Sequence, residues 1–507
     1  MSFNHSKIIS YKKWLSATIF SIILLFALWG LVKYPGQTIV YVLFTLVSNA
    51  LLYIGFRKNA IFFDAFIGLF FWLGFWLKFT LRLIFFERQF AEPTGNINSI
   101  GIYAYDYALL VASFGLFGLL LVSLIRQHFS WNYPKTIATI VQPNLFAFYK
   151  KHRKYIILFF IVLIFGIAVS NVILGIYQRG TVTQTFLPFG LNGIYKWLLL
   201  FGLASFSALI LRFEFEINKK TSLLAMCLAL LEGFASSASL LSRGMILNAS
   251  ALLYGSFISL KIYSIKSTIK FWLISLAIFS VLFATSVISV NYLRAHSYIF
   301  HATTSAPSAI ASSSSSTQNA TTEATSTINP SASLINLDVL SVAAAYIPPL
   351  LTDRWVGMEG VMAVSSYPHL GWDLWKTAWE EVYDEKTTSF YDLNIIQTPY
   401  VNANTDKHHF ISLPGIIAFF FYPGSFLFLF ASMFALGGFA ALMEGLTYKL
   451  GGRNIILCAL MAQVIAYRFA SFGYVPAQSY LLIGSLFLNI LIIYFLEQIM
   501  AHIKKNK

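Results

Sequence analysis

The chain has 507 residues, of which 58% are hydrophobic and only 11% are charged, and it contains 49 Phe, 27 Tyr and 11 Trp. Since a water-soluble domain carries about a quarter of its residues as charges, this composition excludes a wholly soluble protein. The net charge of +15 could suit a nucleic-acid partner, but the positions of the charges along the chain argue for another origin.

Apolar segments of about 20 residues, long enough to cross a bilayer, recur along most of the sequence. Backbone groups in lipid must be satisfied within the segment, so we expect helices. The predicted spans are residues 14–32, 37–56, 60–86, 103–125, 155–176, 193–212, 221–240, 244–260, 271–290, 411–447, 454–470 and 477–498. The expected fold is therefore an all-α integral membrane protein with about 12 transmembrane helices.

The segments between these spans differ in charge. If the N-terminus is cytoplasmic, 22 of the 35 Lys and Arg residues fall at the cytoplasmic ends of the spans. Membrane proteins retain basic residues on that side, so both termini are expected in the cytoplasm. The positive charge then reflects topology, and no nucleic-acid partner is expected.

One long outer loop divides the chain. Spans 1–9 occupy residues 1–290, the loop covers 291–410, and spans 10–12 occupy 411–507. Residues 302–333 are nearly all Ser, Thr, Ala and Asn, a composition that cannot offset the entropy of ordering and predicts disorder.

The second part of the loop, residues 335–410, is expected to be partly helical. Trp372, Trp375 and Trp379 recur at helical spacing and predict an amphipathic helix over 371–382. An aromatic helix outside the membrane suits the headgroup zone or the cap of a bundle.

Several kinds of chemistry are not indicated. Cys227 and Cys458 fall inside predicted spans and are expected to behave as small hydrophobic residues. The first apolar run is too long for a removable signal peptide. No nucleotide-binding loop or clustered metal ligands occur, so we expect no cofactor and no metal.

Charged residues within or beside spans are functional candidates because burying them in lipid is costly. Arg243, in the tight turn Ser242-Arg243-Gly244, either reaches the headgroups or binds a lipid-linked phosphate. Lys78 and Arg82 share one helix face four residues apart, and either reach the headgroups or bind pyrophosphate.

The outer loop adds two further groups. Arg354 and Glu359 either form a salt bridge within the loop, or bind an anion and accept a proton, respectively. His408 and His409 precede the tenth span and are either structural or a general base. Weaker candidates on the same side are Arg179, Lys196, Arg294 and Arg468.

This architecture is similar to that of the O-antigen polymerase and ligase superfamily, bacterial membrane enzymes with 10–14 helices and one enlarged periplasmic loop. Residues 240–255, LLSRGMILNASALLYG, resemble a Ser-Arg-Gly-plus-apolar-helix pattern of the polymerases. Arg179 and Gly190 match an arginine-X10-glycine spacing of polymerase loops. The segment from His408 loosely resembles the ligase pattern but lacks its Gly-x-x-Gly.

The resemblance implies polymerisation of undecaprenyl-pyrophosphate-linked oligosaccharide repeat units at the periplasmic face of the bacterial inner membrane. It implies a metal-independent glycosyltransferase whose partners are the lipid-linked glycan, membrane lipids and a chain-length regulator protein. Arg243 and Arg354 would neutralise the departing pyrophosphate, with Lys78, Arg82 and Arg179 in support. Glu359 or His409 would take the acceptor proton.

Other functions remain open. An O-antigen ligase would use the same donor with a different acceptor. A flippase for lipid-linked oligosaccharide predicts charges at mid-membrane depth and an internal helix repeat, whereas most intramembrane charges here lie towards one side, with Glu232 the main exception. A structural or receptor role is the third possibility. A polyprenyl-phosphate-sugar transferase is disfavoured, because the first outer loop, residues 32–37, contains no acid.

Overall fold

The computed structural model describes residues 5–57, 60–128, 143–242, 244, 246–304, 355–382, 384–385, 387–397, 411–473 and 476–505. This part of the chain is helical and contains no β-strand, which confirms the expected all-α class. The predicted disordered segment 302–333 lies, from residue 305 onward, outside the described residues.

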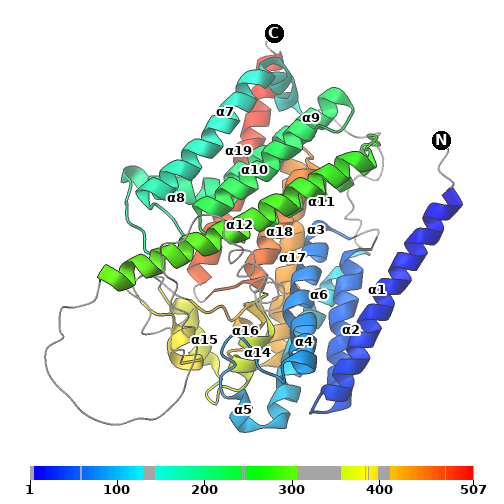
Figure 1. Ribbon diagram of the computed structural model, residues 1–507, viewed down its shortest axis with the longest axis vertical. Helices are drawn as coiled ribbons and strands as arrows, with labels where there is room; N and C mark the ends of the chain where they lie inside the picture. Colours follow the sequence, from blue (N-terminus) through cyan, green and yellow to red (C-terminus); the bar gives the residue numbers. More distant parts are fainter. Residues whose placement is uncertain are drawn as a thin grey trace, which may run out of the picture.

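The long helices form one bundle (Figure 1). They are α1 (His5–Lys33), α2 (Thr38–Gly55), α6 (Ile102–Arg126), α7 (Asn144–Leu174), α9 (Leu203–Asn218), α10 (Leu223–Ser239), α11 (Ile246–Ile262), α12 (Ile269–Thr304), α17 (Phe426–Leu450), α18 (Ile455–Ala470) and α19 (Pro476–Lys505). The segment 62–85 comprises α3 (Phe62–Phe71), a π-helical turn (Trp72–Leu77) and α4 (Lys78–Phe85). Shorter helices are α5 (Ile97–Ile100), α8 (Leu191–Trp197), α14 (Met358–Ser365), α15 (Trp372–Glu380) and α16 (Ile416–Phe420).

Among the described residues, eight helices are long and apolar enough to cross a membrane, and four shorter apolar helices accompany them. These are the helices of a multi-pass membrane protein. Each predicted span falls on one of these helices, while the total of 12 crossings and their orientation stay predictions.

The predicted span 411–447 is wrong at its start, because α16 and α17 are separate helices. Pro423 and Gly424 stand between them, and Gly424 has a φ of +74°, which favours glycine. Only α17 is long enough to be a span.

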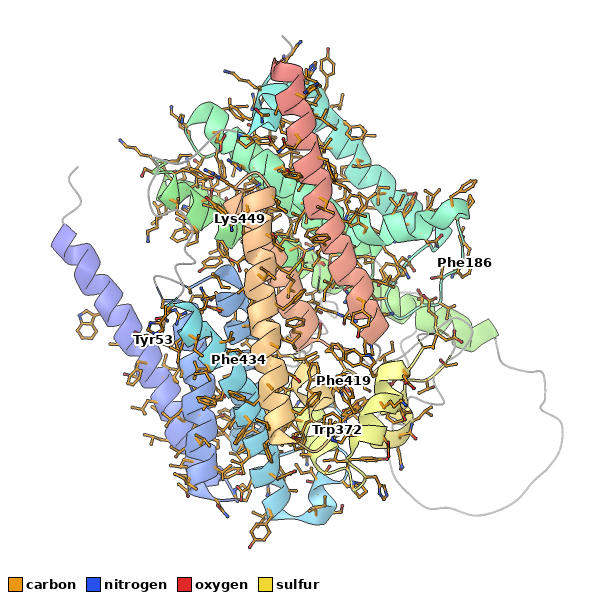
Figure 2. The ribbon with its side chains drawn as sticks, turned by 180° about the vertical axis from the view of Figure 1, so that it is seen from behind. Tyr53, Phe186, Trp372, Phe419, Phe434 and Lys449 are labelled. Atoms are coloured by element: carbon orange, nitrogen blue, oxygen red, sulfur yellow. The ribbon has the colours of Figure 1, made fainter. Side chains whose placement is uncertain are left out.

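The bundle has two ends (Figure 1). Both chain termini lie at one end, which we call the terminal end. The helices α5, α14 and α15 lie at the other end, which we call the loop end. Figure 2 shows the same arrangement from behind, with Lys449 towards the terminal end and Trp372 towards the loop end.

The predicted amphipathic helix is confirmed as α15, and it caps the bundle. The Trp375 and Trp372 rings contact Phe428 at the start of α17, with centroids 5.3 and 4.9 Å away. The Trp379 ring contacts Phe419 of α16 at 6.0 Å. These aromatic contacts fix the outer-loop segment against the transmembrane helices.

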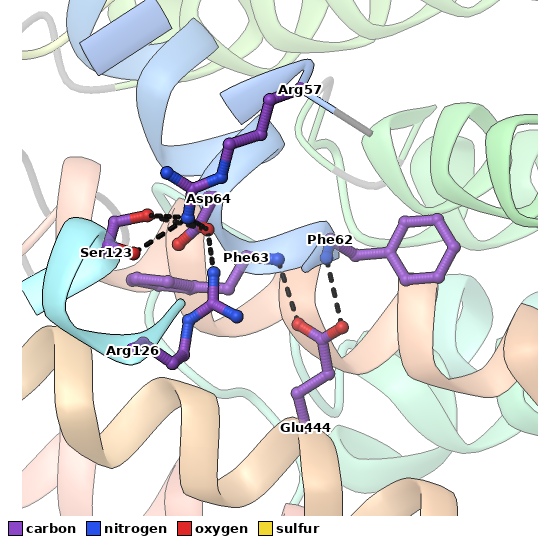
Figure 3. Close-up of polar contacts among 7 residues, drawn as sticks. All are labelled: Arg57, Phe62, Phe63, Asp64, Ser123, Arg126 and Glu444. Atoms are coloured by element: carbon purple, nitrogen blue, oxygen red, sulfur yellow. Dashed lines mark hydrogen bonds and ion pairs between the residues drawn. The ribbon is translucent and has the colours of Figure 1, made fainter. Parts of the chain in front are cut away.

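Carboxylates organise the terminal end (Figure 3). Glu444 of α17 accepts hydrogen bonds from the first backbone amides of α3, at 3.0 Å from Phe62 and 2.9 Å from Phe63. A carboxylate suits this position because a helix N-terminus carries partial positive charge and unpaired N–H groups. Beside it, Asp64 pairs with Arg126 and lies 3.6 Å from Arg57. The start of α3 is therefore fixed by charge.

We predict that Glu444→Leu lowers the free energy of unfolding by about 2–3 kcal/mol, because two buried amides lose a charged acceptor. Glu444→Gln retains one acceptor oxygen and should lose about half as much. Unfolding of the detergent-solubilised protein, followed by circular dichroism, measures both. Equal stability of the wild type and Glu444→Leu would show that the α3 cap contributes nothing.

Candidate functional site

The π-helical turn before Lys78 lets the loop segment approach the bundle. A side chain at Gly74 would collide with the carbonyl oxygen of Val356, and one at Gly357 would collide with the carbonyl of Gly74. Two glycines facing each other thus bring residues 355–357 directly against this helix. Helical π-turns are frequently found at functional sites.

Lys78 lies at this junction with its side chain only 1% exposed. Its ammonium forms an ion pair with Glu359 of α14 and donates a hydrogen bond to the Trp355 carbonyl at 3.0 Å. A membrane helix and the outer-loop segment are therefore joined by a buried charge pair.

The backbone of α14 next to Glu359 also packs tightly against the segment that precedes α16. The next residue, Gly360, packs so closely on Pro414 that a side chain there would collide with the Pro414 carbonyl. Burial raises the pKa of the Glu359 carboxyl above its usual range, and the nearby Lys78 ammonium only partly opposes this effect. The Glu359 carboxyl therefore holds a proton more readily than an exposed glutamate does.

Arg82 lies one turn beyond Lys78. Its guanidinium donates to the Gln89 carbonyl at 2.8 Å and lies 4.5 Å from the centroid of the Phe86 ring. The Arg82 side chain therefore organises the loop that follows α4.

A second group of cations lies at the loop end of α7 and α18. We call it the arginine cluster, and it consists of Arg179, Arg468, Lys196, Tyr177 and Tyr467. Arg179 lies beside both tyrosine side chains, and it is close enough to Arg468 for their charges to repel. Lys196 of α8 adds a third cation, with Nζ 4.6 Å from the centroid of the Tyr177 ring.

Nothing in the described chain neutralises this cluster. Arg468 donates through Nε to Ser479 at 2.9 Å, but its buried Nη2 has no hydrogen-bond partner among the described residues. No carboxylate within those residues forms a salt bridge with Arg179, Lys196 or Arg468. Clustered, partly buried cations are costly unless an anion joins them.

Ser242 and Gly244, the described residues of the predicted Ser-Arg-Gly turn, lie close to the arginine cluster. The Arg179 amide donates to the Leu240 carbonyl at 2.9 Å, and Ser242 donates to Ser237 at 3.0 Å. A Cβ at Gly244 would lie 2.7 Å from the Tyr467 hydroxyl, so a larger residue there would force the Tyr467 ring to move. The described residues on either side of position 243 are therefore held next to the arginine cluster.

One phenylalanine connects the two groups. The Phe70 ring of α3 stacks on Trp355 with centroids 6.0 Å apart, and meets Tyr467 edge-on at 6.0 Å. Trp355 supplies the carbonyl that Lys78 contacts. The Lys78–Glu359 pair and the arginine cluster thus flank Phe70 and form neighbouring parts of one region.

The structure brings together part of the predicted set. Lys78 meets Glu359, Arg82 lies beside them, and Arg179 lies in the arginine cluster. The pairing of Glu359 with Lys78 was not predicted from the sequence. Arg243, Arg354 and His409 lie outside the described residues.

Tyr177 and Tyr467 were not among the predicted site residues, and Arg468 was predicted only as a weak candidate. The sequence does carry a signal for these tyrosines, because each one lies within two residues of an arginine at the loop end of a helix.

A third group lies behind α14. Glu381 accepts from the Phe390 amide at 2.6 Å, yet burial raises the pKa of Glu381 to about 7. Asp392 accepts from the Ser412 amide at 3.2 Å and from the Ser389 hydroxyl at 2.5 Å. These acids fix the segment that leads into α16. Within the described residues, no three His, Cys, Asp or Glu side chains are placed to hold a metal ion.

No protein-family model, curated protein or solved structure matches this chain.

Proposed function

We propose that the protein is a membrane glycosyltransferase that uses a polyprenyl-pyrophosphate-linked oligosaccharide as donor and polymerises oligosaccharide repeat units. The observation that carries this proposal is the arginine cluster, in which Arg179, Lys196 and Arg468 gather without a carboxylate in the described chain. Such a group requires an anion, and arginine forks match phosphate oxygens bidentately.

The position of the cluster favours a lipid-linked anion. Arg468 occupies the last turn of the apolar helix α18, and Arg179 follows the long apolar helix α7. An anion bound there would sit at the rim of the apolar bundle. A pyrophosphate on a polyprenyl chain matches this place, because its lipid stays in the bilayer and its glycan extends beyond the loop end.

The reaction needs no metal in principle, because a glycosyl pyrophosphate already has a good leaving group. A hydroxyl oxygen of the acceptor forms a bond to the anomeric carbon while the bond from that carbon to the phosphate oxygen breaks. The arginine cluster stabilises the negative charge on the departing lipid pyrophosphate. The proton of the acceptor hydroxyl goes to a carboxylate, for which Glu359 is the candidate.

The glycan profile of a deletion strain tests the proposal. We expect loss of long surface glycan chains, with a single repeat unit still attached, and recovery when the wild-type gene is restored. Loss of all attached glycan would indicate a ligase instead. An unchanged profile would refute both activities.

A further inference from the structure

A cleft of about 740 Å³ opens at the loop end, between the segment that follows α4 and the start of α6. We call it the loop-end cleft. Its lining comprises residues 87–94 together with Asn98, Gly101, Ile102 and Tyr105. This volume falls within the range of about 300–1,000 Å³ typical of small-molecule sites.

The charge of the cleft differs from that of the arginine cluster. Among the described residues that line it, Glu87, Glu92 and Arg88 carry the formal charges, which sum to one negative charge. An anion such as pyrophosphate is disfavoured there. The Tyr105 hydroxyl donates to the side-chain oxygen of Asn98 at 2.8 Å, so the amide nitrogen of the exposed Asn98 is available as a donor.

The cleft has a fixed backbone. Glu87 and Arg88 have φ angles of +47° and +68°, which cost energy in residues other than glycine and persist only where the surroundings impose them. Arg82 contributes by donating to the Gln89 carbonyl at 2.8 Å. The Phe90 ring stacks on Phe79 of α4, with centroids 6.2 Å apart.

The far side of the cleft is tied to α14, the helix that carries Glu359. The Asn96 amide donates to the Ser366 hydroxyl at 3.1 Å. Gly95 adopts a φ of +63° and packs against Ala363, leaving no room for a side chain. In addition, the Glu92 carboxylate lies near enough to Glu359 to raise its pKa. The cleft therefore adjoins the Lys78–Glu359 pair.

We propose that the loop-end cleft binds uncharged sugar residues of the acceptor glycan and presents a hydroxyl towards Glu359. Sugars offer many hydroxyls, and the cleft offers the Glu87 carboxylate to accept from them and the Asn98 amide and Arg88 guanidinium to donate to them. Because the backbone is already fixed, little ordering is needed on binding. This inference rests on the proposed transferase function. It places the acceptor glycan in the loop-end cleft and the donor pyrophosphate at the arginine cluster.

Binding measurements on the full-length protein in lipid nanodiscs test the assignment. The probes are uncharged oligosaccharide released by mild acid from the lipid-linked pool of the source cells, and inorganic pyrophosphate. In the double variant Arg88→Ala/Asn98→Ala we expect oligosaccharide affinity to fall at least tenfold, with pyrophosphate affinity unchanged. The exposed Lys376→Ala on α15 is the control and should bind both probes like the wild type.

Each outcome decides the question. Unchanged oligosaccharide affinity in the double variant overturns the inference, and so does a selective loss of pyrophosphate affinity, which would make the cleft an anion site. A tenfold loss of oligosaccharide affinity supports it. If that loss occurs while the deletion strain keeps a normal glycan profile, the cleft stands as a sugar site and the transferase proposal fails.

Discussion

Replacing Lys78 with methionine should lower the free energy of unfolding by about 3–5 kcal/mol, because it leaves Glu359 buried without its cation. The Glu359 side chain is only 5% exposed, so water cannot solvate its carboxylate once the Lys78 cation is gone. Methionine retains the length and apolar stem of lysine, so the change falls on the polar contacts of the ammonium, among them the ion pair with Glu359 and the hydrogen bond from Nζ to the Trp355 carbonyl.

The loss should depend on pH. Burial raises the pKa of Glu359 and the Lys78 ammonium lowers it, so the pKa rises further in Lys78→Met. A carboxyl with a raised folded-state pKa binds more protons folded than unfolded. Stability is then complete below the unfolded pKa of about 4.3, and falls as the pH rises through the folded pKa.

Unfolding midpoints of the solubilised protein between pH 5 and 9 measure this effect. Lys78→Met should approach wild-type stability at pH 5 and lose most at pH 9. The double variant Lys78→Met/Glu359→Leu removes both charges and should recover part of the loss. A deficit in Lys78→Met that is the same at every pH would show that packing around Lys78, and not its charge, carries the stability.

The membrane helices could be predicted from the sequence because lipid imposes a simple rule of length and hydrophobicity. All predicted spans fall on helices, and Trp372, Trp375 and Trp379 correctly predicted the outer amphipathic helix. The division of 411–447 was missed, since the apolar segment continues through Pro423 and Gly424 and masks the break.

The site was harder to predict because its contacts join residues far apart in the chain. Lys78 and Glu359 are 281 positions apart, and Arg179 and Arg468 are 289 apart. Charge placement identified these cations as candidates at one side of the bundle. Their partners depend on helix packing, such as the approach of Val356 to Gly74, for which a single sequence carries no period or motif.

Arg468→Gln should reduce glycan chain formation at least 100-fold while leaving the protein as stable as the wild type. The first effect corresponds to about 2.7 kcal/mol of lost transition-state stabilisation. The second follows from the surroundings of Arg468, because its removal relieves repulsion with Arg179 and leaves no unpaired carboxylate. The lost hydrogen bond to Ser479 costs about 1 kcal/mol and opposes this gain.

Chain formation in membranes and unfolding of the purified variant measure the two effects, with the exposed Lys261→Gln at the terminal end as the matched control cation. The comparison of activity with stability distinguishes an arginine that supports the fold from one that binds substrate. An arginine that only supports the fold loses stability and activity together, whereas one that binds substrate loses activity alone. Wild-type chain lengths in Arg468→Gln, or a parallel fall in both quantities, would remove the arginine cluster from the proposed reaction. Loss of chain formation at full stability, together with weaker pyrophosphate binding, would place the anion at Arg468.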